Sequence, residues 1–254
     1  MSITERDIMG GLAKGLAVIE TFSAARPRQS IAEVAEASGL DRATARRCLL
    51  TLAHHGYAEW DGKFFTLTPR VLRLGTACLA TMPLPQIVQP VLDDLSERIG
   101  QSTSVSILDG AEIVYIARAA QKKVMSVGLM PGSRLPAYCT SMGRVLLAAR
   151  PPAEVRGLLL SSPLARRTPH TRTDPEDIMA ELAHVRAQGY AIIDQEVELG
   201  LRSLAVPLYD GHGRMIAALN VGVAAIHAAP EQLVGLYLSQ LQRVQSDLRP
   251  LLRA

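Results

Sequence analysis

One stretch, residues 31–62, restricts the fold of this chain more than any other part of its sequence. It reads IAEVAEASGLDRATARRCLLTLAHHGYAEWDG and predicts a helix, a glycine turn, a second helix and the first strand of a hairpin. Ala35 supplies a small apolar contact on the first helix, and Gly39 permits the tight turn that follows. Asp41 is placed to cap the second helix. This order is typical of a helix-turn-helix unit.

The predicted second helix has two chemically distinct faces. Its apolar side repeats at the i, i+3, i+4, i+7 spacing of a helix packed on a core: Ala45, Cys48, Leu49 and Leu52. Its other side carries Arg42, Ala43, Thr44, Arg46 and Arg47. A helix with one apolar seam and three arginines on its other face fits the major groove of DNA. The alternative interpretation is an ordinary solvated face on a small helical bundle.

A hairpin follows this helix directly. Two strand-like runs, residues 56–60 and 63–67, flank Asp61 and Gly62, which form a strong turn pair. The tip of such a wing lies near the sugar-phosphate backbone, so Lys63 is predicted to contact phosphate. Turn, arginine face and wing, in this order, favour DNA binding.

Length and composition set further limits. A length of 254 residues leaves room for two modest domains, and the net charge is only +3. So small a charge does not by itself indicate DNA binding, and the prediction depends on the position of the arginines. It favours a protein that recognises two half-sites of a specific sequence over one that binds DNA non-specifically.

The three cysteines lie far apart and form no C-x-x-C pair, which argues against a structural zinc and a disulfide framework. We expect no metal and no cofactor. Without a signal-like start or an apolar stretch of about 18 residues, we expect a cytoplasmic protein with no membrane partner.

Breaks in the sequence pattern predict three parts. Residues 1–68 form the winged helix-turn-helix DNA-binding domain, residues 69–82 a linker helix, and residues 83–254 a second domain. Pro83 and Pro85 mark the boundary. The linker helix is the predicted route by which a ligand in the second domain alters DNA binding.

The second domain alternates between strand and helix signals. Helices are predicted over residues 86–99, 141–149, 152–160 and 174–188, and a long amphipathic helix ends the chain. Strands are predicted over residues 103–108, 112–117, 123–129, 201–209 and 214–223. Hairpins at both ends with helices between them predict an antiparallel sheet flanked by helices, so the fold class of the chain is α+β.

Four blocks make the chain resemble the IclR family of bacterial transcriptional regulators over nearly its full length. They are GLAKGLAVIETF, SIAEVAEASGLDRATARRCLLTL, RLPAYCTSMGRVLLA and GYAIIDQEVELGLRSLAVPLYDGHGRMIAALNVG. The last two look most like the branch of PcaR, PcaU and PobR regulators, which control protocatechuate and 4-hydroxybenzoate breakdown through the β-ketoadipate pathway. The resemblance implies a GAF-like effector-binding domain and a homodimer on palindromic operator DNA. It also implies pairing of dimers into tetramers and RNA polymerase as a further partner.

A loop entering a helix, residues 139–144, is one candidate part of the effector pocket. Free backbone N–H groups at a helix N-terminus favour an anion such as a carboxylate. Thr140, Ser141, Met142 and Gly143 are therefore candidate effector contacts. Two plainer interpretations stay open, with Ser141 as a simple N-cap and Gly143 as a site of close packing.

The resemblance adds a second set of candidates. Effector residues of the family fall at positions that match Asp194, Ser203, Asn220 and Gly222, and Glu196 lies in the same acidic segment as Asp194. Asn220 and Gly222 stand where some relatives have serines. Because polar groups set specificity in otherwise apolar pockets, these departures leave the identity of the effector open.

Two arginines and a cysteine complete the candidates. Arg134 suits a carboxylate held by two hydrogen bonds, or alternatively an ion pair with Asp194 or Glu196 that braces the pocket, and Arg118 is a weaker candidate. Cys139 as a thiol nucleophile is the enzyme alternative. The six histidines sit in no catalytic motif, so no catalytic or metal-binding residue is predicted.

These patterns together predict a ligand-responsive transcription regulator. The resemblance favours an activator that responds to an aromatic acid such as protocatechuate or 4-hydroxybenzoate, or to β-ketoadipate. The alternative within the family is a repressor that responds to a different small carboxylic acid.

Overall fold

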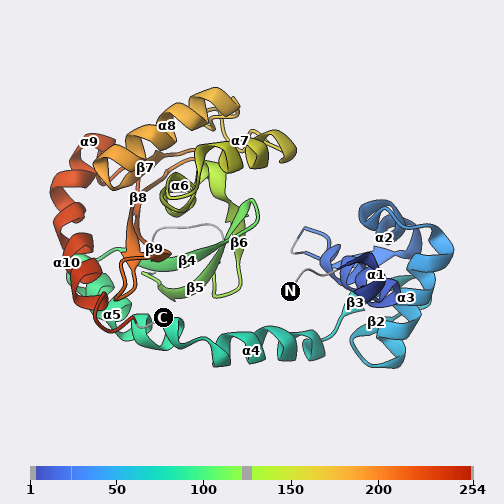
Figure 1. The fold of residues 1–254 in the computed structure, drawn as a ribbon. Helices are drawn as coiled ribbons and strands as arrows, with labels where there is room; N and C mark the ends of the chain where they lie inside the picture. The colour runs from blue at the N-terminus through green and yellow to red at the C-terminus, as the bar shows by residue number, and fades with distance from the viewer. Residues whose placement is uncertain (1–3, 24, 122–127, 253–254) are drawn as a thin grey trace. The chain divides into compact units, whose positions relative to one another are not determined.

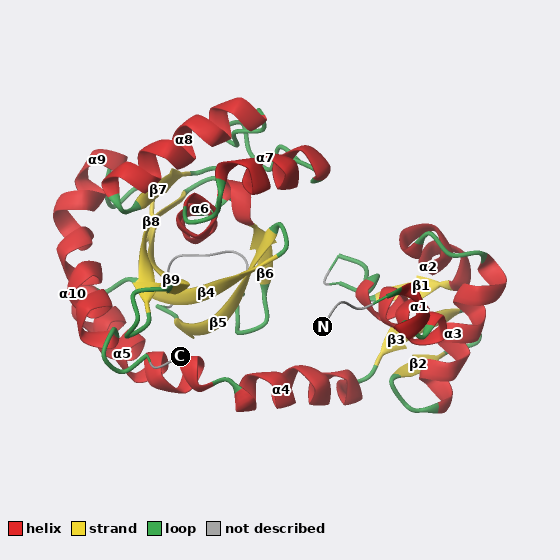
Figure 2. Cartoon of the chain, viewed as in Figure 1, coloured by secondary structure: helices red, strands yellow, loops and turns green. Residues whose placement is uncertain are grey.

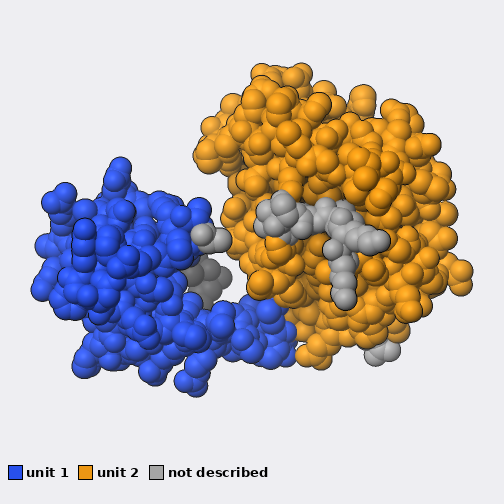
Figure 3. All heavy atoms as spheres, turned by 180° about the vertical axis from the view of Figure 1, so that it is seen from behind, with its two compact units in different colours: residues 1–81 blue, residues 82–254 orange. Residues whose placement is uncertain are grey.

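Apolar residues of this chain gather into separate cores, and these cores divide it into two units. Residues 1–81 form the first unit and residues 82–254 the second (Figure 3). The computed structural model describes residues 4–23, 25–121 and 128–252. The division falls next to the proline pair that marks the predicted boundary.

The first unit is a winged helix-turn-helix. Its helices are α1 (Gly10–Glu20), α2 (Ile31–Ser38), α3 (Arg42–His54) and α4 (Leu72–Thr81). Its strands are β1 (Arg28–Ser30), β2 (Ala58–Trp60) and β3 (Phe64–Leu67), paired antiparallel in the order β1-β3-β2. Its core contains fully buried side chains from three helices and a strand: Val18, Val34, Ala45, Leu49 and Phe65. The predicted helices and hairpin are confirmed, and β1 is a short strand that the sequence pattern did not predict.

Local hydrogen bonds explain why α2 and α3 begin and end where they do. The N–H of Ser30 donates to the Glu33 carboxylate at 2.7 Å, and the N–H of Glu33 donates back to the Ser30 hydroxyl at 3.4 Å. This reciprocal pair is a capping box, which satisfies donors that the first turn of a helix leaves free. Gly39 ends α2 with a φ of 67°, a left-handed conformation that glycine adopts without strain.

The second unit is a mixed domain built on one antiparallel sheet (Figure 2). Its helices are α5 (Pro83–Ile99), α6 (Ser141–Ala148), α7 (Pro152–Ser161), α8 (Pro175–Gln188), α9 (Pro230–Leu233) and α10 (Ser239–Leu248). Its strands are β4 (Ser102–Asp109), β5 (Glu112–Ala119), β6 (Arg134–Pro136), β7 (Ala191–Asp194), β8 (Leu201–Tyr209) and β9 (Met215–Ala224). The strand order is β6-β5-β4-β9-β8-β7 with every pair antiparallel, which confirms the predicted α+β class.

Helices cover both faces of this sheet. Helices α5 and α10 pack with Leu204 and Leu219 in one core, whereas α6, α7 and α8 pack with Ala205 and Ala218 in the other. Figure 1 shows α6 inside the curve of the sheet, with α5 and α10 outside it. Successive strand residues alternate between faces, so Ala205 and Ala218 face α6, and their small side chains let it lie close to the strands.

A few predicted boundaries differ from the structure. Helix α5 begins at Pro83, three residues before the predicted start, because proline at the first helical position needs no N–H partner. The strand predicted over residues 123–129 lies almost wholly outside the described residues, and the short strands β6 and β7 were not predicted. A wider turn over Val234–Leu238 separates α9 from α10 in the predicted C-terminal helix.

Within the described residues, no single helix has the length and apolar character needed to cross a membrane. The segments Pro69–Thr81 and Pro83–Ile99 reach that length and composition only when the two halves of a sharply bent pair are counted together.

Gly143→Ala tests the close approach between α6 and the turn before it. A Cβ atom at Gly143 would lie 2.2 Å from the carbonyl oxygen of Ala137, so we expect a loss of about 1–3 kcal/mol or more in the free energy of unfolding. Gly157→Ala on α7 is the matched control, because nothing lies within 4 Å of the place that a Cβ atom would take there and alanine favours helix. Urea unfolding followed by circular dichroism measures both. Equal stabilities of the two variants would contradict the packing account.

Candidate functional site

Helix α3 presents the arginine face that the sequence predicts. Ala45 and Leu49 are fully buried in the core of the first unit. The opposite side of the helix carries exposed residues: Arg42, Ala43, Arg46 and Arg47. Three guanidinium groups on the exposed side of a second helix match what the major groove of DNA accepts.

Thr44, also predicted to contact DNA, is engaged within the helix itself. Its N–H and its hydroxyl donate to the two carboxylate oxygens of Asp41, at 2.9 Å and 2.7 Å. These hydrogen bonds cap α3 and hold the pKa of Asp41 below its usual value. A contact between Thr44 and DNA therefore competes with the cap.

Asp61 orders the tip of the wing. Its carboxylate accepts the N–H of Phe64 at 2.9 Å and the N–H of Lys63 at 3.0 Å, and it forms an ion pair with Arg28 of β1. These contacts hold the pKa of Asp61 well below its usual range, and the hydrogen bond from the N–H of Phe64 has the largest effect. The side chain of Lys63 is exposed at the tip, the position predicted for a phosphate contact.

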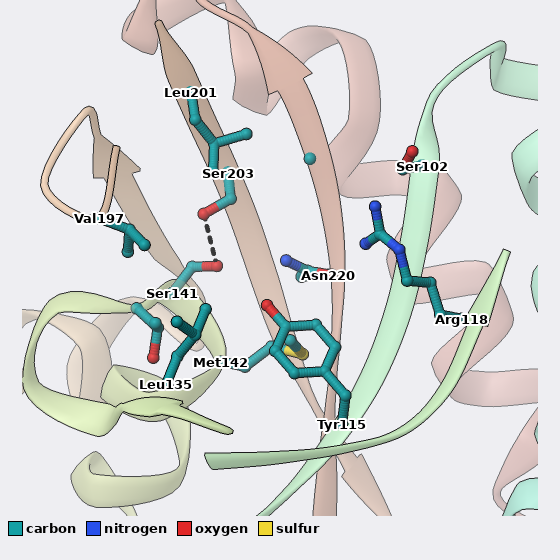
Figure 4. Close-up of a pocket in the computed structure, with 12 residues that line it drawn as sticks. Ser102, Tyr115, Arg118, Leu135, Ser141, Met142, Val197, Leu201, Ser203 and Asn220 are labelled. Atoms are coloured by element: carbon teal, nitrogen blue, oxygen red, sulfur yellow. Dashed lines mark hydrogen bonds between the residues drawn. The ribbon is translucent and has the colours of Figure 1, made fainter. Parts of the chain in front are cut away.

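A pocket lies between α6 and the curved sheet of the second unit (Figure 4). Twelve residues line it: Ser102, Tyr115, Arg118, Leu135, Thr140, Ser141, Met142, Val197, Leu201, Ser203, Asn220 and Gly222. Six of the predicted effector residues and the weaker candidate Arg118 are among them; the six are Thr140, Ser141, Met142, Ser203, Asn220 and Gly222. The fold therefore brings the start of α6 together with β8 and β9.

Strand pairing sets the pattern of side chains on the sheet side of the pocket. Directly paired residues in an antiparallel sheet point to the same face. Two adjacent rows cross the strands in this way: Ser102–Gly222–Ser203 and Arg118–Ser104–Asn220. The two rows place polar side chains next to one another although they come from separate strands.

A β-bulge in β5 brings Tyr115 and Arg118 to the same face. Ser104 pairs with Arg118 and Ser106 pairs with Tyr115, so two steps along β4 match three along β5. The extra residue is Ile116, which is buried in the opposite core. Residues three apart on a regular strand point to opposite faces, so no alternation in the sequence reveals this pair.

Polar contacts in the pocket gather at two ends. The Ser203 hydroxyl donates to the Ser141 hydroxyl at 2.8 Å, which joins β8 to the start of α6. Nη1 of Arg118 donates to the hydroxyl of Ser104 at 3.0 Å. Figure 4 shows the Arg118 guanidinium and the serine pair on opposite sides of Asn220 and the ring of Tyr115. The pocket thus has a cationic end and a hydroxyl end.

Asn220 and Tyr115 are buried polar groups between these ends. Asn220 is 8% exposed, and within the described parts of the chain no donor reaches its Oδ1. A buried acceptor without a donor costs about 1–3 kcal/mol, so a group that donates to Asn220 is stabilised there. Burial, opposed by the charge of Arg118, raises the pKa of Tyr115 to about 12, so its phenol keeps its proton at neutral pH.

Arg134 does not line the pocket. The predicted pairing of Arg134 with Asp194 or Glu196 is wrong, because its guanidinium binds Asp109 and Glu112, each at 2.7 Å. The reason is strand register, since β6 pairs with the start of β5 and carries Arg134 to the hairpin end of that strand.

Asp194 and Gly143 also lie outside the lining. Asp194 binds Arg202 at 2.6 Å. Burial raises the pKa of Asp194, but hydrogen bonds from Arg202 and Gln195 outweigh it and hold the pKa below its usual value. The N–H of Gly143 donates to the Thr140 hydroxyl at 3.1 Å, so Thr140, rather than Ser141, caps α6. The close approach of Gly143 to the preceding turn supports the packing interpretation.

Glu196 lies behind the pocket in a buried ion pair with Arg144 of α6. Nη2 of Arg144 donates to Glu196 Oε2 at 2.7 Å, and the two side chains are 1% and 7% exposed. Nε of Arg144 donates to the carbonyl of Tyr138, and the N–H of Arg172 donates to the same oxygen of Glu196, both at 3.1 Å. The pair therefore fixes the start of α6 to the loop that carries Val197 into the pocket.

Cys139 has the wrong environment for a nucleophile. Its side chain is fully buried, and burial raises the pKa of the thiol to about 11. Nucleophilic cysteines have lowered pKa values, because the thiolate is the reactive form. In the part of the chain that the structure describes, no group of three or more His, Cys, Asp or Glu residues is arranged to hold a metal ion.

The free space in the pocket is narrow. The cavity has a volume of about 30 Å³. This is room for about one or two water molecules. An organic ligand therefore fits only when the lining side chains move apart.

Comparisons with known proteins match both parts of the chain. Residues 11–62 match the IclR helix-turn-helix domain, and residues 76–248 match the C-terminal domain of the bacterial transcriptional regulator IclR. The chain is 44% identical to the Pca regulon regulatory protein of Pseudomonas putida, over 95% of this chain and 84% of that protein. It is 36% identical to the p-hydroxybenzoate hydroxylase transcriptional activator of Acinetobacter baylyi, over 98% and 94% of the two chains.

A solved structure shares the fold of both units. It is an IclR homolog from Microbacterium hydrocarbonoxydans complexed with 4-hydroxybenzoate. The similarity covers 94% of this chain and 99% of that one, with 29% identity and a TM-score of 0.71.

A DNA-reading helix in one unit and a small-molecule pocket in the other define a transcription regulator that responds to a ligand. The chain belongs to the IclR family of bacterial transcriptional regulators.

Arg144→Met tests the buried ion pair. Removing one partner leaves the Glu196 carboxylate buried without its cation, so we expect a loss of about 3–5 kcal/mol in the free energy of unfolding. Arg156→Met is the matched control, because its pair with Glu176 is 47% and 64% exposed and contributes less than about 1 kcal/mol. Circular dichroism in urea measures both, while the fluorescence of Trp60, the single tryptophan, follows the first unit alone. Similar losses in the two variants would contradict the structural role of the pair.

Arg46→Ala and Arg47→Ala test the reader helix. An arginine that reads guanine contributes about 1–3 kcal/mol of discrimination, so each variant should bind operator DNA about 10-fold or more weakly. Fluorescence anisotropy on duplexes that the wild-type protein selects from a random pool measures this. Arg156→Ala removes the same charge from the second unit and should bind normally. Wild-type affinity in both α3 variants would mean that α3 does not read DNA.

Proposed function

We propose that this chain regulates transcription in response to an aromatic hydroxy acid of the 4-hydroxybenzoate or protocatechuate type. The observation that carries the proposal is the chemistry of the pocket lining, with a cation at one end, hydroxyls at the other and apolar walls between. Leu135, Met142 and the ring of Tyr115 supply walls for an aromatic ring. Likeness to a p-hydroxybenzoate hydroxylase activator and to a 4-hydroxybenzoate complex supports the same class of ligand. Genes for aromatic acid breakdown are the expected targets.

On the DNA side, two copies of the chain place two α3 helices on palindromic half-sites. Arg42, Arg46 and Arg47 read or clamp the bases, and Lys63 holds phosphate. The homodimer, its pairing into a tetramer and contact with RNA polymerase belong to this proposal, as does action as an activator in the cytoplasm.

The ligand acts by shifting the balance between two conformations, because only a difference in affinity between states can move an equilibrium. The narrow pocket supplies such a difference, since a ring enters only when the lining side chains of the sheet and of α6 move apart. Helix α4, which has no buried residue of its own, is the proposed route of the signal between the units.

Calorimetric titration with 4-hydroxybenzoate, protocatechuate and β-ketoadipate tests the effector. We expect saturable binding of an aromatic acid that is lost when Ser203→Ala and Asn220→Leu are combined, because both residues line the pocket. Ser246→Ala, an exposed serine on α10, is the control and should bind like the wild type. Failure of all three acids to bind would contradict the proposal and favour a repressor for a different small carboxylic acid.

A further inference from the structure

The pocket carries charge at one end only. Among the twelve described residues that line it, Arg118 is the one with a formal charge. Its side chain is half-buried, and the 3.0 Å hydrogen bond to Ser104 holds the guanidinium over the sheet. A partly desolvated guanidinium attracts a carboxylate more strongly than one in water, and its planar fork suits both carboxylate oxygens.

The other end of the pocket is neutral and rich in hydroxyls. Ser203 donates to Ser141 at 2.8 Å, so the oxygen of Ser203 keeps lone pairs for a further donor. Asn220 lies between the two ends with its buried Oδ1 lacking a donor from the described residues. These neutral oxygens can accept a hydrogen bond from a ring hydroxyl. They carry no positive charge that would pair with a carboxylate.

We propose that Arg118 binds the carboxylate of the effector and that the Ser141–Ser203 pair binds a ring hydroxyl at the opposite end. This assignment rests on the proposed function. Arg118 stands on β5 and Ser203 on β8, three strand spacings apart, or about 14 Å at about 4.8 Å each. Figure 4 shows the two side chains on opposite sides of Asn220, so an aromatic ring with a substituent at each end would bridge them once the lining side chains move apart.

The reverse orientation places the carboxylate at the start of α6. A helix N-terminus presents only about half an elementary charge, against the full charge of a guanidinium. One free donor of the first turn is already used there, since the N–H of Gly143 donates to the Thr140 hydroxyl. The reverse orientation would also place the neutral ring hydroxyl, rather than the carboxylate, beside the guanidinium of Arg118.

Titration of the full-length protein with 4-hydroxybenzoate and its neutral amide, 4-hydroxybenzamide, tests the assignment. Arg118→Met should weaken binding of the acid by about 10- to 100-fold, because a charge-assisted hydrogen bond is lost, and change binding of the amide by less than about threefold. Arg118→Lys should restore part of the acid affinity. Unchanged thermal unfolding by circular dichroism shows that each variant is folded.

The hydroxyl end has its own comparison. Ser203→Ala should weaken binding of 4-hydroxybenzoate but leave that of benzoate, which lacks the hydroxyl, within about threefold of the wild type. Ser246→Ala is again the control. An equal loss of both acids in Ser203→Ala would show the reverse orientation and overturn the assignment.

The outcomes separate this assignment from the proposed function. Full affinity for 4-hydroxybenzoate in folded Arg118→Met overturns the assignment and leaves the proposed function intact. If the wild type binds β-ketoadipate and no aromatic acid, the proposed function is wrong, while loss of that binding in Arg118→Met upholds the carboxylate assignment. Binding of none of these acids overturns both.

Discussion

The effector domain is organised around a buried ion pair between α6 and the loop after β7. Arg144 and Glu196 are almost fully buried, and the backbone of Tyr138 and Arg172 adds hydrogen bonds to Nε of Arg144 and Oε2 of Glu196. Burying two charges is costly unless their geometry is good and further hydrogen bonds support them, and here the pair has a short contact and two backbone hydrogen bonds. Because the pair joins the first turn of α6 to the segment bearing Val197, it fixes two walls of the pocket at once.

The third wall is the sheet, and its approach to α6 depends on small residues. Ala205 and Ala218 face the helix from β8 and β9, and Gly143 lets the helix meet its own preceding turn. Polar side chains from β4, β5, β8 and β9 fill the remaining space in two rows. In the proposed function, a ligand that enters moves these walls, so that binding is coupled to a change of conformation in this domain.

Local sequence patterns predicted the first unit well, because helix caps, the left-handed Gly39 and the Asp61 turn each act within a few residues. The pocket depends on register between distant strands, which a single sequence shows only weakly. The bulge at Ile116 aligns Tyr115 and Arg118, and no spacing rule reveals it. The same limit explains the wrong pairing of Arg134, whose partners were set by the unpredicted strand β6.

We propose that an aromatic acid binds between α6 and the sheet, and hydrogen–deuterium exchange of the full-length protein with and without 4-hydroxybenzoate tests this. We predict slower exchange at the start of α6, in β5 and in the loop over residues 195–200, because the ligand contacts these segments and orders them. Unchanged exchange in these segments, with protection confined to α1–α3 or to the α5–α10 face of the sheet, would contradict the account.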